Sequence, residues 1–151
     1  MSPYEKLSSL NIQLPAPVGS LAAFVPTVQV DRLLFVSGHI ARRDGKPWVG
    51  RLGAGVSVAE GQEAARAVAI DLLATLHAEL GSLERVRRIV KLLVLVNAAP
   101  DFVEPHLVAN GASELLREVF GEAGAHARSA LGVAQLPLGA CVEVEMILEV
   151  D

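Results

Sequence analysis

The sequence predicts a single α+β domain in which one mixed β-sheet carries two helices on one face. Three observations indicate this class. Two long segments have helical periodicity, an almost continuous apolar segment lies between them, and short alternating segments lie at both ends of the chain. The expected order is ββ(β)αβαββ. A length of 151 residues suits one domain, and the chain contains neither an internal repeat nor a linker.

The N-terminal third is expected to hold an extended lead-in and then short strands. Residues 1–22 are rich in proline and form the lead-in. Residues 25–30 and 33–37 are expected to be two strands joined by a turn. A polar Asp44-Gly45 turn follows, and Trp48-Val49 is expected at a short strand edge.

The first helix is predicted over 58–80. Ser57 and Glu60 form a capping box at its start, its apolar residues recur with a helical period, and Gly81 is a natural terminator. A short helical turn is expected over 83–86.

The middle strand is predicted over 89–97. This segment is apolar and β-branched on nearly every residue, which indicates a strand buried on both faces. The second helix is expected over 104–120, since its apolar residues again share one side.

The last two strands are predicted over 128–134 and 140–150. In the final strand the even-numbered residues 142–150 should face the helices. The odd-numbered ones mix carboxylates with apolar residues on a face that the chain does not cover. We therefore expect a homo-oligomer with sites at the seam between subunits.

Composition and residue spacing indicate neither a nucleic-acid partner nor a metal site. The net charge of −4 and the pI of about 5.6 disfavour a nucleic-acid partner, and the basic cluster 85–88 is interpreted as a solvated helix end or strand entry. Cys141 is expected to fill apolar space, and the four histidines lack metal-site spacing. With no leader and no apolar run of about 20 residues, a cytoplasmic protein without a membrane segment is expected.

Arg128 and Glu143 are the leading candidates for a site. An arginine is permanently charged, and its planar fork binds a carboxylate through two parallel hydrogen bonds. If Leu136 faced Gly139 across a tight turn, the last two strands would form a hairpin with these two side chains roughly 13 Å apart. A bulge, a neighbouring subunit or a bridging substrate would then have to close the gap.

The chain resembles the RidA (YjgF, L-PSP endoribonuclease) family from about Phe24 to its C-terminus. The resemblance rests on Ala127-Arg128-Ser129, Val133, Leu136-Pro137 and Val142-Glu143-Val144-Glu145, with support from Phe35 to Ile40. It implies a chorismate-mutase-like fold, a homotrimer, and hydrolysis of reactive imines and enamines such as 2-aminoacrylate to 2-oxo acids and ammonia.

Carried over residue by residue, the resemblance implies that Arg128 clamps the substrate carboxylate and that Glu143 activates water. Gly38 would let the substrate approach the backbone, Ser129 would offer backbone groups, and Asn110 would match a family asparagine at an offset of one residue.

Two positions depart from the family pattern. Phe24 stands where an aromatic hydroxyl is usual, and Ala130 stands where a cysteine is frequent. These departures indicate a divergent branch of the family. Two other functions stay open: a non-catalytic trimer that binds a small carboxylate, and the endoribonuclease that the family's older name implies, which the acidic pI and the scarcity of aromatic residues disfavour.

Overall fold

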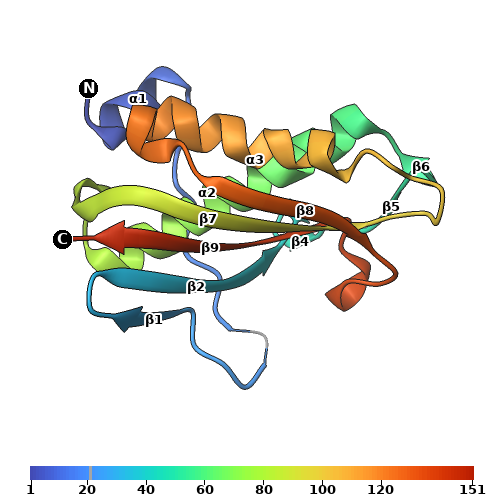
Figure 1. Ribbon diagram of the computed structural model, residues 1–151, viewed down its shortest axis with the longest axis horizontal. Helices are drawn as coiled ribbons and strands as arrows, with labels where there is room; N and C mark the ends of the chain where they lie inside the picture. The colour runs from blue at the N-terminus through green and yellow to red at the C-terminus, as the bar shows by residue number, and fades with distance from the viewer. Residues whose placement is uncertain (21) are drawn as a thin grey trace.

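The computed structural model describes residues 1–20 and 22–151 and consists of a five-stranded sheet with helices on one face (Figure 1). The strand order is β1-β2-β9-β7-β8, in which β7 and β8 are parallel and the other pairs are antiparallel. The strands are β1 (Thr27–Val30), β2 (Leu33–Ile40), β7 (Val86–Asn97), β8 (Ala127–Val133) and β9 (Val142–Val150). The predicted α+β class is confirmed.

Two small strand pairs lie outside the main sheet. β3 (Arg42–Arg43) pairs with β4 (Lys46–Pro47), and β5 (Arg51–Leu52) pairs with β6 (Gly55–Val56). Three short 3₁₀ turns, η1 (Leu83–Arg85), η2 (Gly121–Gly124) and η3 (Pro137–Gly139), connect the larger elements.

The two long helices lie where the sequence predicted them. α2 (Val58–Leu80) starts at the Ser57 capping box and ends at Gly81, which adopts the left-handed conformation with φ 80°. α3 is Pro105–Phe120. The apolar sides of α2 and α3 and the even-numbered residues of β9 form the buried core, so the predicted orientation of the last strand is confirmed.

The prediction for the N-terminus is wrong in one respect, because the expected extended lead-in contains a third helix. α1 (Pro3–Ser9) has a capping box between Ser2 and Glu5. The Tyr4 hydroxyl accepts a hydrogen bond from the Leu83 backbone at 2.7 Å, which ties the helix to the domain. Leu21, within the same lead-in, lies outside the described residues.

The predicted hairpin of the last two strands is also wrong. β7 lies between β8 and β9 in the sheet and is hydrogen-bonded to both. The reason is that β7, α3 and β8 form a crossover unit, which makes β8 parallel to β7 and leaves it at the sheet edge. The connection through η3 therefore passes over the end of β7 before β9 begins.

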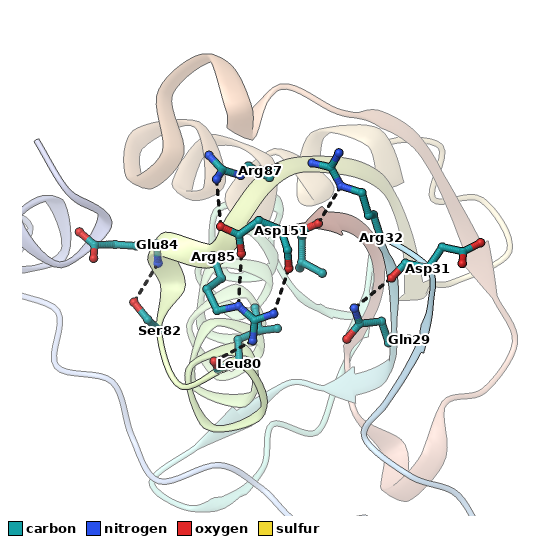
Figure 2. Close-up of polar contacts among 10 residues, drawn as sticks. Gln29, Asp31, Arg32, Leu80, Ser82, Glu84, Arg85, Arg87 and Asp151 are labelled. Carbon is teal, nitrogen blue, oxygen red and sulfur yellow. Dashed lines mark hydrogen bonds and ion pairs between the residues drawn. The ribbon is translucent and has the colours of Figure 1, made fainter.

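Basic residues at the start of β7 hold the end of β9 (Figure 2). The Asp151 carboxylate accepts from Arg85 Nε at 3.2 Å and from Arg87 Nη2 at 2.9 Å. All three side chains are substantially exposed, so these ion pairs stabilise the fold only slightly. The cluster 85–88 thus runs from the end of η1 into the start of β7, so both parts of the sequence interpretation, a helix end and a strand entry, apply.

The face of the sheet opposite α2 and α3 is open, since no α-helix among the described residues 1–20 and 22–151 covers it (Figure 1). On β7 the helix side is fully buried, whereas Leu93 and Leu95 on the open side are only partly buried. The prediction of a strand buried on both faces therefore does not hold within one chain. Exposed apolar residues continue this open face on the neighbouring strands: Val28, Val30, Leu33, Phe35 and Leu131.

In the part of the chain that the structure describes, none of the helices is both long and apolar enough to cross a bilayer.

Candidate functional site

A cavity of about 830 Å³ lies beside the ends of β2 and β9, and three of the predicted site residues line it. These are Phe24, Gly38 and Glu143. Residues 18–20 and 22–26 and the η3 turn complete its walls. The lining is mostly apolar, but four charged side chains also reach it: Arg42, Asp71, Glu143 and Glu145.

Gly38 sits in an irregularity of β2 that brings the Glu143 carboxylate close to the backbone. The pairing of β2 with β9 shifts register between Val36 and His39. A Cβ atom added at Gly38 would overlap Oε2 of Glu143. Glycine is required here because a side chain would not fit, and not because of the backbone conformation, since Gly38 does not have a positive φ.

Glu143 is half-buried, and its surroundings favour the neutral acid. Burial raises the pKa of Glu143 above its usual range, and the nearby Glu145 charge raises it further. Within residues 1–20 and 22–151 no donor or cation lowers this pKa. A carboxyl of this kind can accept a proton from water at neutral pH more readily than an ordinary glutamate.

His39 fixes the irregular segment of β2 to helix α2. Its Nδ1–H donates to the Ser37 carbonyl at 2.8 Å, so Nε2 accepts from the Thr75 hydroxyl at 2.7 Å. Burial lowers the pKa of His39, which keeps this arrangement neutral. Both ring nitrogens are thus occupied, and His39 supports the cavity wall rather than exchanging protons with its contents.

Asp71 is a cavity residue that the sequence reasoning missed. It lies on α2, and burial raises its pKa although Arg42 and His39 lower it. A single acid in the otherwise apolar run 67–74 was the available signal.

Arg128 belongs to a separate cluster with helix α3. Its Nη1 donates to Asn110 Oδ1 at 2.9 Å and to Ser113 Oγ at 3.2 Å, and its Nη2 donates to the His106 carbonyl at 3.0 Å. Nε–H and the second hydrogen of Nη2 make no hydrogen bond to the described residues. The guanidinium is therefore held on one side and keeps donors for a ligand.

The sheet separates Arg128 from Glu143. Arg128 pairs with Leu92, whose side chain lies on the buried helix face. Glu143 pairs with Leu95 on the open face. With β7 between their strands, the two residues lie at least two strand spacings apart, roughly 10 Å, and point to opposite faces. No bulge brings them together within one chain.

The remaining predicted residues lie on β8 near Arg128. Ser129 is exposed on the open face beside Leu93, whereas Ala130 packs against the core on the helix face. The predicted set is thus divided: Phe24, Gly38 and Glu143 line the cavity, while Asn110, Arg128, Ser129 and Ala130 lie along the edge strand and α3.

The fold is that of a chorismate-mutase-like α+β domain, and the candidate site residues lie on it in two separate clusters. A family model described as "YjgF/chorismate mutase-like, putative endoribonuclease" matches residues 5–150. The chain belongs to this YjgF/RidA family.

Individual relatives agree with the family assignment. Protein TCP17 of Trypanosoma cruzi is 48% identical over 147 residues, which are 96% of this chain and 92% of that protein. The solved structure of a putative endoribonuclease from Shewanella oneidensis is 31% identical, with a TM-score of 0.95 over 99% of this chain and 100% of that one. RidA from an Antarctic Psychrobacter species is 25% identical, with a TM-score of 0.59 over 89% and 94% of the two chains.

Proposed function

We propose that this protein hydrolyses reactive imines and enamines, of which 2-aminoacrylate is the simplest, to 2-oxo acids and ammonia. The observation that carries the proposal is the division of the site. One cluster offers an unpaired carboxyl in an apolar cavity, and the other offers a held guanidinium with free donors. Together they supply the acid and the carboxylate anchor that such a reaction requires.

The two half-sites would meet between subunits of a homotrimer. The open face of the sheet carries exposed apolar side chains on β1, β2 and β8, and a surface of this kind is typical of subunit contacts. β8 is an edge strand, so its neighbourhood is accessible to another copy. In this arrangement Arg128 of one subunit would lie at the mouth of the cavity that holds Glu143 of the next.

The reaction needs no cofactor because the C=N bond of an imine is already electrophilic, and an enamine such as 2-aminoacrylate becomes an imine when a proton moves from its nitrogen to its CH2 carbon. Arg128 binds the substrate carboxylate and thereby orients the imine carbon. Glu143 takes a proton from water while the oxygen adds to this carbon, and it passes that proton to the nitrogen, which becomes an amine. Glu143 then takes the hydroxyl proton of the carbinolamine and passes it to the same nitrogen as the C–N bond breaks, so that the carbonyl of the 2-oxo acid forms and ammonia leaves.

Phe24 bears on whether the protein hydrolyses its ligand or only binds it. Its ring lines the cavity but carries no hydroxyl to hold a water molecule or the substrate. This favours, as a second candidate, a trimer that binds small carboxylates without turning them over. The RNA cleavage suggested by the names of relatives would require a site for a polyanion, whereas the cavity is lined by three carboxylates and one arginine.

Ammonia release from enzymatically generated 2-aminoacrylate tests the proposal. The wild-type protein should release ammonia, whereas Arg128→Ala and Glu143→Gln should each lose at least about 90% of the rate, since each removes a charged partner. Full activity of either variant would contradict these roles. Carboxylate binding without ammonia release would support the second candidate.

Co-expression of the two inactive variants tests the shared site. Random mixing in equal amounts places an intact Arg128 beside an intact Glu143 at about one seam in four, so about a quarter of the wild-type rate should return. The matched control is a single chain that carries both substitutions, co-expressed with itself under a second tag. If mixed oligomers form and no activity returns, the site is not shared between subunits.

A further inference from the structure

Arg128 stands at the end of a chain of hydrogen bonds that leads back into the protein. Arg128 Nη1 donates to Ser113 Oγ at 3.2 Å, and Ser113 Oγ lies 2.8 Å from His126 Nε2. His126 Nδ1 in turn lies 2.6 Å from the Gly124 carbonyl. These hydrogen bonds thus join strand β8, helix α3 and the η2 turn through three side chains.

The partners fix the direction of every bond in this chain. A carbonyl only accepts, so His126 Nδ1 carries the hydrogen and donates it to Gly124. In the neutral ring Nε2 is then an acceptor, and it takes the Ser113 hydroxyl hydrogen. The lone pairs of Ser113 Oγ are left facing Arg128, which can only donate.

We propose that Ser113 and His126 are positioning residues that orient the Arg128 guanidinium for a substrate carboxylate. Asn110 and the His106 carbonyl hold two other N–H groups, so Ser113 supplies the third contact that fixes the plane of the fork. This inference rests on the proposed function, in which Arg128 is the carboxylate anchor.

Burial and the charges around His126 keep its ring neutral, so that Nε2 accepts the hydrogen bond from Ser113. Burial lowers the pKa of His126, and the positive charges of Arg128 on β8 and Arg117 on α3 lower it further. Arg117 is itself partly neutralised by Glu122 of η2 at 3.5 Å. If His126 gained a proton, Nε2 would donate to Ser113, so the direction of this hydrogen bond would reverse, and a second cation would lie near Arg128. The carboxylate affinity should then change as the pH falls through the pKa of His126.

Calorimetric binding of pyruvate, the 2-oxo acid expected from 2-aminoacrylate, tests the positioning role. Ser113→Ala should weaken pyruvate binding by about ten-fold at neutral pH, because Arg128 loses one of three contacts. Ser113→Thr keeps the hydroxyl and should restore most of the affinity. Glu114→Ala, at an exposed neighbouring position of α3, is the control for helix effects.

A pair of His126 variants provides a readout that loss of packing alone would not move. His126→Gln places a neutral amide oxygen near the position of Nε2, so this variant should bind pyruvate more tightly than His126→Ala and lose the change in affinity at low pH. If Ser113→Ala binds as the wild type does, or if His126→Gln keeps the wild-type pH profile, the positioning role is refuted. If neither the wild-type protein nor Arg128→Ala bound pyruvate, this result would instead refute the carboxylate site and, with it, the positioning role.

Discussion

Glu143 is the residue on which the proposed chemistry depends, and its environment sets the pH at which it can act. It must be ionised to take a proton from water, while burial and the Glu145 charge both raise its pKa. Activity should therefore be present above the pKa of Glu143 and should decline as the pH falls through it.

Glu145→Gln should move this acid limb to lower pH. The substitution removes a like charge and thus lowers the pKa of Glu143 toward its ordinary value, while burial still holds it above. The measurement is kcat/KM against pH, which reports ionisations of the free enzyme. Glu149→Gln is the matched control, since Glu149 lies farther along the same face of β9 and pairs with Arg32 at 3.3 Å. An unmoved limb in Glu145→Gln would remove Glu143 as the titrating group.

Strand β2 is the element that shapes the cavity, because its irregular segment brings backbone and Glu143 together. Gly38→Ala should lower kcat/KM by at least about ten-fold while leaving the Tm within a few degrees. The added methyl group would displace the end of the Glu143 side chain, which is flexible, rather than backbone. Wild-type kinetics in Gly38→Ala would contradict this geometry.

Local signals in the sequence predicted the helices and strands, but they did not predict the order of the strands in the sheet. The Ser57 capping box and Gly81 mark the two ends of α2 in the sequence, because both act on adjacent backbone groups. The Leu136–Gly139 turn is equally local, yet it does not determine whether β7 inserts between β8 and β9. At α1 the Ser2 and Glu5 capping box was present, but the prolines that follow suggested an extended segment.

The candidate site could be predicted only as far as its residues carry a family pattern. Arg128, Glu143 and Gly38 have such a pattern, and Asn110 proved to contact Arg128 directly. Ser113 and His126 lie on separate elements and meet only in the folded protein, so no spacing in the sequence indicates their contacts. The opposite faces of Arg128 and Glu143 follow from the crossover of β8, which only the sheet order reveals.

The whole molecule is expected to be functional only as an oligomer, because one chain holds the two half-sites on opposite faces of its sheet. Phe35 lies on the open face with 41% of its surface exposed. Phe35→Glu would bury a charge in the proposed interface, at a cost that a small contact cannot offset. We expect the mass in sedimentation analysis to fall from three times the 15.9 kDa chain mass to that of one chain, with loss of ammonia release.

Val103→Glu is the matched control for this change. Val103 is 78% exposed and lies in the loop before α3, away from the sheet face. It should remain trimeric and active, since a charge there stays in water. A Phe35→Glu protein that separates into folded monomers yet keeps its activity would show that one chain completes the site. A wild-type protein that sediments as a monomer would contradict the shared site from the outset, because Arg128 and Glu143 could then not face one substrate.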